Sequence, residues 1–136
     1  DAEDDAVGRI RLLPAAVEIA LAGDRVDEAD RYCAELEDGA EKFDSPGFRA
    51  WARHARGAVL VSQDRAAEAL PVLQDALRRY RTTQRRHELA QVYQWMAQAH
   101  RATGDTVSAA ADTAMTANGN TVMGGYATGI DPVITR

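Results

Sequence analysis

The chain has 136 residues, 46 % hydrophobic and 27 % charged, which is ordinary for one globular domain. The sequence contains no run of about 18 apolar residues that would indicate a membrane span. Its net charge of −5 gives no reason to expect direct binding to nucleic acid. The chain begins without Met or a leader-like stretch, and its single Cys33 cannot form an internal disulfide. We therefore expect a piece of a longer protein from a reducing, cytoplasmic compartment.

The first two predicted helices run from about Ile10 to Ala22 and from Val26 to Phe43, where apolar residues recur at helical spacing. Pro14 fits the first helix only in its opening turn, where the missing N–H is not needed. Gly23 is expected to end that helix and Asp24 to cap the second.

The next two predicted helices contain one clear start signal and one violation of helix rules. Ser45-Pro46 is a polar cap followed by Pro at the first helical position, which predicts a helix that continues to about Ser62. Asp64 is expected to cap the fourth helix. Pro71 lies too deep in that helix for a first-turn position, so we expect a bend just before it.

The last two predicted helices span about His87–Thr103 and Thr106–Thr116, with Asp105 as the cap of the second. Asn118-Gly119-Asn120 indicates a turn, and the glycine-rich residues that follow have no helical period. We therefore predict that the repeat stops before an irregular tail, residues 118–136, which packs in an extended form on a helical surface.

These six segments form three pairs that superimpose at a spacing of 40 residues. Two columns of this alignment hold small or turn-forming residues: Ala29, Ala69 and Ala109, and Asp24, Asp64 and Gly104. Repeats of this length are typical of solenoids, in which each unit buries its apolar face against its neighbours. The predicted fold class is all-α, a superhelix of three antiparallel helix pairs in one domain, residues 1–117, with units at about 10–49, 50–89 and 90–117.

Short strings recur around the expected helix crossings. They are Gly57-x-x-Leu60, then Asp64-Arg65-Ala66-Ala67-Glu68-Ala69 with Leu73 and Ala76, and Arg101-Ala102-Thr103-Gly104-Asp105 before Ala109. The pairs that contain these strings resemble tetratricopeptide repeats, although the usual unit of that family has 34 residues. Small residues such as Gly57 let two helices approach closely.

A second likeness extends over residues 10–115. The strings that carry it are Leu12 to Asp24, Leu36-Glu37, Phe43, Ser45-Pro46, Ala55 to Leu60 and Ala69-Leu70-Pro71 through Tyr80. This stretch is similar to the helical repeat region of large LuxR-type (MalT-like) bacterial transcriptional regulators. In that family the region lies between a nucleotide-binding module and a helix-turn-helix that reads DNA, and neither signature occurs here. The resemblance implies a regulatory middle segment.

The likeness to tetratricopeptide repeats also implies a concave groove lined by the first helix of each pair. The register of the three units places nine residues there: Arg11, Glu18, Trp51, His54, Gln91, Gln94, Trp95, Gln98 and Arg101. Amide and guanidinium groups beside two indoles suit a peptide, whose backbone needs donors and whose side chains need apolar anchors. The alternative is that Trp51 and Trp95 belong to the core between repeats.

No catalytic or metal-binding set can be assembled from the sequence. His54 and His100 lie on different predicted helices without a carboxylate at ligand spacing, and His87-Glu88 lacks the second His of a zinc motif. We therefore expect no enzyme and no cofactor or metal. A basic cluster surrounds the end of the fourth helix: Arg78, Arg79, Arg81, Arg85, Arg86 and His87. It is explained either by the preference of cations for helix C-termini or by docking on an acidic neighbour.

The leading functional expectation is a non-enzymatic interaction module from a bacterial signal-responsive transcriptional regulator, which binds a protein partner or neighbouring domains of its own polypeptide. The alternative is a free-standing adaptor that captures a peptide in the groove. Because three repeats leave exposed end faces, self-association through the end repeats is a further expectation.

Overall fold

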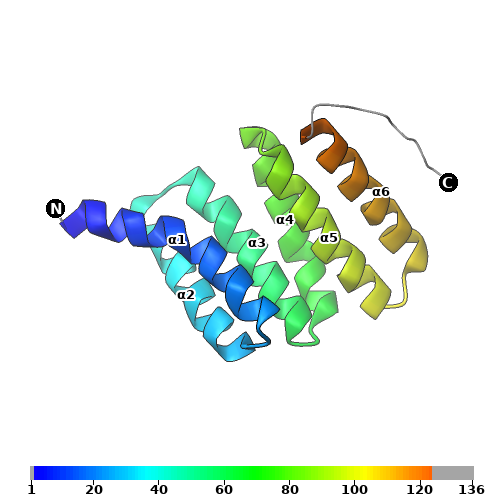
Figure 1. Cartoon of the computed structure of the whole chain (residues 1–136), viewed down its shortest axis with the longest axis horizontal. Helices are drawn as coiled ribbons and strands as arrows, with labels where there is room; N and C mark the ends of the chain where they lie inside the picture. The colour runs from blue at the N-terminus through cyan, green and yellow to red at the C-terminus, as the bar shows by residue number, and fades with distance from the viewer. Residues whose placement is uncertain (1, 124–136) are drawn as a thin grey trace.

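The computed structural model describes residues 2–123, with the course of the helix alone after Thr116, and this range is all-helical without a strand. Six helices follow one another: α1 (Ala2–Ala22), α2 (Val26–Phe43), α3 (Pro46–Ser62), α4 (Ala66–Thr83), α5 (Arg86–Ala102) and α6 (Thr106–Met123). Consecutive helices run antiparallel and are joined by tight turns (Figure 1). The predicted all-α class is confirmed.

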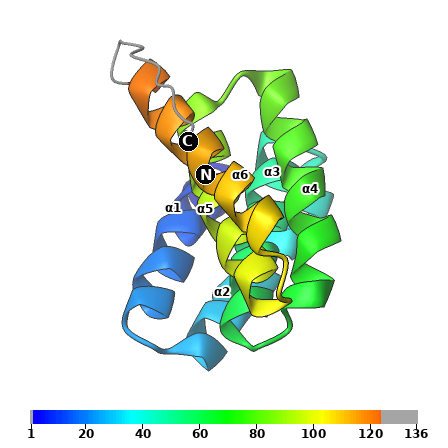
Figure 2. The ribbon, with the colours of Figure 1, turned by 90° about the vertical axis from the view of Figure 1, so that its right-hand side faces the viewer.

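Helix ends recur with a period of 40 residues. The odd-numbered helices end at Ala22, Ser62 and Ala102, and the even-numbered helices end at Phe43, Thr83 and Met123. The turn predicted at Asn118-Gly119-Asn120 is therefore wrong, since α6 continues through it. Helix α6, which runs along α5 (Figure 1, Figure 2), is helical here despite the roughly 1 kcal/mol that Gly costs in a helix. The rest of the predicted tail, from residue 124, lies outside the described residues.

Two of the expected caps are turn residues instead. Asp24 and Asp64 both have a φ of 61°, and Gly104, which shares their column, has 87°. They follow the ends of α1, α3 and α5, where a left-handed residue is common and Asp is tolerated. The N-caps of α2 and α4 are Arg25 and Arg65, whose side chains make no capping hydrogen bond.

The other two expected caps are confirmed. The backbone N–H of Phe48 donates to Ser45 Oγ over 3.1 Å, with Pro46 at the first position of α3. The backbone N–H of Ser108 donates to Asp105 Oδ1 over 3.0 Å at the start of α6. Each bond satisfies one of the donors that a helix N-terminus leaves without an intrahelical partner.

Two helices contain a proline in their interior. Because α1 begins at Ala2 rather than near Ile10, Pro14 lies in its middle and not in the expected opening turn. Acidic residues in the first turn of α1 favour this early start. Pro71 lies inside α4, which is continuous from Ala66. At each proline the carbonyl four residues earlier loses its intrahelical donor.

The core consists of two clusters of buried side chains that share helix α3. The first joins α1, α2 and α3 around Leu13, Leu36 and Val59, and the second joins α3, α4 and α5 around Leu73. Trp51 packs against both clusters. The alanines of the repeat column are at most 3 % exposed: Ala29, Ala69 and Ala109. Their small side chains let the two helices of a pair approach closely.

The odd-numbered helices are packed more tightly than the even-numbered ones. Helix α1 contacts α3 and α3 contacts α5, whereas within the described residues no contact joins α2 to α4 or α4 to α6. The first helices of the three pairs are thus neighbours, and the even-numbered helices stand apart over α3 and α5. None of the helices in the described range has both the length and the apolar character needed to cross a bilayer.

Candidate functional site

A cleft with a volume of about 260 Å³ lies between the odd-numbered helices. Its lining comes mainly from α1, α3 and α5: Arg11, Pro14, Ala15, Val17, Glu18, Trp51, His54, Ala55, Tyr80, Glu88 and Gln91. Five of the nine residues predicted for the groove are therefore brought together here: Arg11, Glu18, Trp51, His54 and Gln91.

One hydrogen bond joins the two outer walls of the cleft. Gln91 Nε2, on α5, donates to Glu18 Oε2, on α1, over 3.1 Å, although the two residues are 73 positions apart in the sequence. The first and third units thus come within side-chain reach of one another across α3. This bond places an amide and a carboxylate group together in the lining of the cleft.

The floor of the cleft is polar but uncharged. His54 Nδ1 lies 2.9 Å from the hydroxyl oxygen of Tyr80, and the two rings meet edge to face at 5.7 Å between centroids. Burial lowers the pKa of His54 to about 4, with a smaller effect of nearby His87, so its imidazole is neutral at pH 7. Burial also raises the pKa of the Tyr80 hydroxyl. The His54–Tyr80 pair therefore carries no charge at pH 7, and its two polar atoms bond to each other.

Trp51 forms an apolar wall of the cleft and contacts both an aromatic ring and a guanidinium group. Its ring stacks on Phe48 with centroids 5.8 Å apart, and the Arg85 guanidinium lies 5.5 Å from the indole centroid. Arg85 in turn pairs with Glu88 over 3.5 Å. Trp51 is half-buried and contacts both core clusters. It therefore belongs to the core between repeats, as the alternative stated, and also lines the cleft.

The other four predicted groove residues do not line this cleft. Gln94, Gln98 and Arg101 are exposed on α5, and Trp95 is half-buried against the second core cluster. Gln94 corresponds to His54 in the 40-residue register, so it lies on the equivalent helix face. Among the odd-numbered helices of the described chain, only α3 contacts α5, whereas α3 itself lies between α1 and α5.

Sequence reasoning missed Tyr80, which comes from the second helix of a pair. Its place on an apolar stripe indicated only that it is buried, and Tyr80 is 0 % exposed. A buried tyrosine hydroxyl usually has a hydrogen-bond partner, which is a usable signal. That the partner is His54 depends on how α3 and α4 pack, and spacing along the chain does not reveal it.

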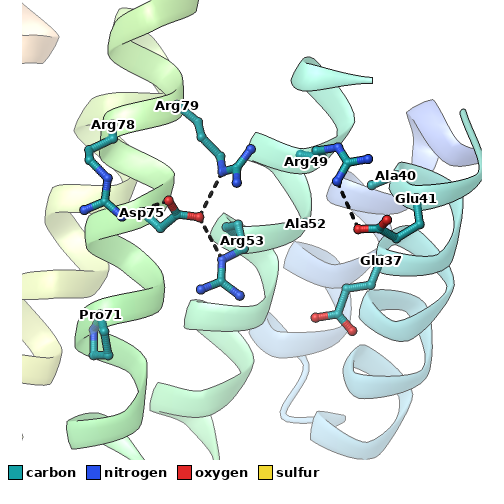
Figure 3. Close-up of a pocket in the computed structure, with 10 residues that line it drawn as sticks. All are labelled: Glu37, Ala40, Glu41, Arg49, Ala52, Arg53, Pro71, Asp75, Arg78 and Arg79. Atoms are coloured by element: carbon teal, nitrogen blue, oxygen red, sulfur yellow. Dashed lines mark hydrogen bonds and ion pairs between the residues drawn. The ribbon is translucent and has the colours of Figure 1, made fainter. Parts of the chain in front are cut away.

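A second, larger hollow of about 670 Å³ lies over α3 between α2 and α4 (Figure 3). Asp75 accepts hydrogen bonds there from Arg53, Arg78 and Arg79 at 3.0, 2.9 and 2.9 Å. Although partial burial acts in the opposite direction, these arginines lower the pKa of Asp75. Arg78 and Arg79 of the predicted basic cluster are thus engaged within the molecule, as parts of an ion-pair network that joins α3 to α4.

Other groups with potential chemistry have structural partners. His100 Nδ1 lies 2.5 Å from Asp112 Oδ2 across α5 and α6, so this histidine has a carboxylate partner on the next helix, which spacing along the chain did not indicate. Burial raises the pKa of Asp112. Cys33 is buried, and burial raises the pKa of its thiol to about 12. Within the described residues, no group of three or more potential ligands is placed to hold a metal ion.

Comparison of the chain with protein-family models, with curated proteins and with solved structures finds no match.

Proposed function

We propose that the chain is a non-enzymatic protein-interaction module, a tetratricopeptide-like superhelix whose cleft between the odd-numbered helices binds an extended segment of another protein or of a neighbouring domain. The observation that carries this proposal is the convergence of Arg11, Glu18, Trp51, His54 and Gln91, from three repeat units, on one cleft. Packing of the odd-numbered helices against one another supports the superhelical arrangement, because the tighter layer of a curved stack lies on its inner side.

The chemistry of the cleft suits a peptide with one apolar anchor. Arg11 and Gln91 offer donors at the rim, Glu18 and Glu88 offer acceptors, and Trp51 offers an apolar wall. A volume of about 260 Å³ is below the range of about 300–1,000 Å³ that is usual for small-molecule sites. It favours the insertion of a side chain while the peptide backbone stays at the rim.

The wider role that we propose is regulation within a cytoplasmic bacterial transcriptional regulator of the LuxR type. The support is the resemblance of residues 10–115 to the helical repeat region of such regulators. Binding in the cleft would act by favouring one of two states of the larger protein. A free-standing adaptor would use the same cleft, and the two roles are distinguished by the coding sequence on both sides of the segment in the source gene.

The cleft is tested with a displayed library of random heptapeptides selected on the immobilised chain. Selected peptides are then titrated by fluorescence anisotropy against the wild type and against the double variant Arg11→Ala plus Gln91→Ala. We expect the double variant to bind about tenfold more weakly, a loss of about 1.4 kcal/mol. The matched control is Gln98→Ala plus Arg101→Ala, two exposed positions on α5 outside the cleft.

The control should leave the affinity within about twofold of the wild type. Equal binding by the wild type and the cleft variant would place the peptide elsewhere and contradict the proposal. A library that yields no binder to the folded chain would also contradict it. Circular dichroism of each variant shows whether the helices are retained.

A further inference from the structure

The hollow of about 670 Å³ between α2 and α4, which we call the α2–α4 hollow, shares no lining residue with the peptide cleft. Small residues of α2 and α3, Ala40 and Ala52, help to line it, and within the described residues α2 makes no contact with α4. In the 40-residue register these alanines correspond to Tyr80 and Val92, which are both 0 % exposed. The volume of the hollow lies within the range of about 300–1,000 Å³ that is usual for small-molecule sites.

The repeat shows that the fold does not require charged residues around this hollow. Helices α4, α5 and α6 stand in the same register to one another as α2, α3 and α4. Four arginines and three carboxylates line the α2–α4 hollow. Of these seven residues, only Glu41 has a charged equivalent 40 positions later in the chain. Arg53 and Asp75, for example, correspond to Tyr93 and Met115. The charges around the hollow are therefore a property of this site and not of the repeat.

The wall formed by α3 and α4 carries more positive than negative charge. Arg53, Arg78 and Arg79 all donate to Asp75, so three positive charges lie beside one negative charge. Arg53 and Arg79 use only Nε in these bonds, and neither has a hydrogen bond from Nη1 or Nη2 to another described residue. Figure 3 shows both guanidinium groups on the side of Asp75 that faces Arg49. Four terminal amino groups can therefore donate to a ligand.

The wall near α2 offers acceptors instead. Arg49 donates to Glu41 over 3.0 Å and to Asp44 over 2.8 Å, so two carboxylates share one arginine. Glu37 accepts two hydrogen bonds from Arg56, each of 2.9 Å. A carboxylate has about four lone-pair sites, so Glu37 and Glu41 can still accept hydrogen bonds from hydroxyl groups. The two walls of the hollow thus favour opposite ends of a ligand.

We propose that the α2–α4 hollow binds a small phosphate monoester that also carries hydroxyl groups. The phosphate oxygens accept from the terminal amino groups of Arg53 and Arg79, and the hydroxyls donate to Glu37 and Glu41. A phosphate monoester carries a charge of about −1.5 to −2 at pH 7, which matches the excess of two positive charges beside Asp75. Guanidinium groups also bind phosphate through two parallel hydrogen bonds.

Two other anionic ligands fit the hollow less well. A single carboxylate supplies one negative charge and leaves the second positive charge of the α4 wall uncompensated. A long acidic peptide would place further carboxylates beside Glu37 and Glu41, where like charges repel. A hydroxyl-bearing phosphate monoester has its negative charge at one end only, which is the arrangement that the two walls favour.

The ligand class is tested by nuclear magnetic resonance titration of the whole chain with glycerol 3-phosphate, methyl phosphate and glycerol at millimolar concentration. Glycerol 3-phosphate should bind most tightly, methyl phosphate more weakly because it lacks hydroxyls, and glycerol should not bind. The amide signals that shift should belong to residues around the hollow. Absence of binding by both phosphates would overturn the proposal, and so would equal affinities for glycerol 3-phosphate and methyl phosphate.

Two substitutions in the same ion-pair network should change the affinity for glycerol 3-phosphate in opposite directions. Arg79→Gln removes a positive charge and should weaken binding about fivefold. Asp75→Asn removes the competing negative charge and should strengthen binding about threefold. Both substitutions break the ion pair between the two residues, so a merely structural effect would give the same sign in both.

The matched control is Arg65→Gln, which removes a positive charge from an arginine that pairs with Glu68 outside the hollow. Its affinity for glycerol 3-phosphate should equal that of the wild type. Weaker binding by Asp75→Asn, unchanged binding by Arg79→Gln, or equal losses in Arg65→Gln and Arg79→Gln would each overturn the proposal. Circular dichroism shows that the helices are retained in each variant that is compared.

Discussion

Protonation of His54 is unfavourable in the folded protein, because the side chain is buried. The imidazole lies on the cleft floor against Tyr80, with Nδ1 2.9 Å from the hydroxyl oxygen. Loss of hydration disfavours the imidazolium there, which is why the pKa falls to about 4. Tyr80 has no exposed surface and supplies no charge that would offset this loss. A single residue thus gives the stability of the protein a dependence on pH.

The first prediction concerns that pH dependence. An unfolded His has a pKa of about 6.5, so between pH 6.5 and 4 the unfolded chain binds a proton that folded His54 does not. The stability from neutral His54 is full above pH 6.5 and is lost as the pH falls toward 4. From pH 7 to pH 5 we expect a loss of about 2 kcal/mol, measured by urea denaturation. His54→Gln should remove this part of the loss. Equal losses in the two proteins would refute the prediction.

The second prediction contrasts two glycines inside helices. A Cβ on Gly57 would lie 2.3 Å from Leu73 Cδ2, whereas nothing lies within 4 Å of one on Gly8. Gly57→Ala should destabilise the fold by about 1–2 kcal/mol, since overpacking exceeds the gain in helix propensity. Gly8→Ala should stabilise the protein by about 0.5–1 kcal/mol. Thermal unfolding of both variants measures the two signs, and a stabilised Gly57→Ala would show that Leu73 moves aside freely.

At the scale of the element, helix ends are set by turn chemistry and helix interiors by packing. The left-handed residues Asp24, Asp64 and Gly104 recur every 40 positions and close the odd-numbered helices at equivalent places. Inside the helices local preference is overruled. Helix α4 continues through Pro71 because Leu73 and its neighbours are buried against α3 and α5. The backbone hydrogen bond that Pro71 cannot donate therefore lowers the stability of the folded protein.

The third prediction compares Pro71 with a proline at a compatible site. Pro71→Ala restores an N–H in the interior of α4 and should stabilise the protein by about 1–2 kcal/mol, after the greater entropy of the unfolded chain is subtracted. Pro46 occupies the first position of α3, where no N–H is needed. Pro46→Ala should therefore destabilise by about 0.5–1 kcal/mol. Urea titrations report both values, and the same sign for the two substitutions would contradict the explanation.

At the scale of the whole molecule, α3 is the helix that links the repeat units to one another. It contributes buried residues to both clusters, and its Trp51 contacts each of them. Neighbouring units in a repeat protein are coupled only through such shared interfaces. Side chains also join the first and third units directly, through the hydrogen bond from Gln91 to Glu18. A substitution that destabilises the first unit should therefore also lower the stability of the third unit.

The fourth prediction tests this coupling with Trp95 as the reporter. In a Trp51→Phe background, the fluorescence of Trp95 follows the second cluster alone. Leu36→Ala removes a fully buried side chain from the first cluster and should cost about 2–5 kcal/mol. The urea midpoint seen by Trp95 should fall together with that seen by circular dichroism. Leu12→Ala, at an exposed leucine, is the control. An unchanged Trp95 midpoint beside a biphasic dichroism curve would show independent units.

Much of the fold was predictable because its signals are local. Apolar spacing gave the six helices, Ser45-Pro46 gave the start of α3, and the column of Ala29, Ala69 and Ala109 gave the repeat. The errors arose at Pro14, which lies inside α1 because that helix begins earlier than apolar spacing indicated, and at the turn expected near Gly119, through which α6 continues. Nine residues were predicted to line a groove, from the resemblance to tetratricopeptide repeats and the register of the units, and five of them line the cleft. Tyr80 was missed because its partner belongs to another helix.

The sequence by itself determined the number and the period of the helices, since backbone hydrogen bonding and the alternation of apolar and polar residues act over a few neighbouring positions. Tertiary structure alone decided the rest. It decided that His54 is held neutral against Tyr80 and that Gln91 reaches Glu18. Both depend on distances between different helices, α3 and α4 in the first case and α1 and α5 in the second, which are set by packing of side chains around α3.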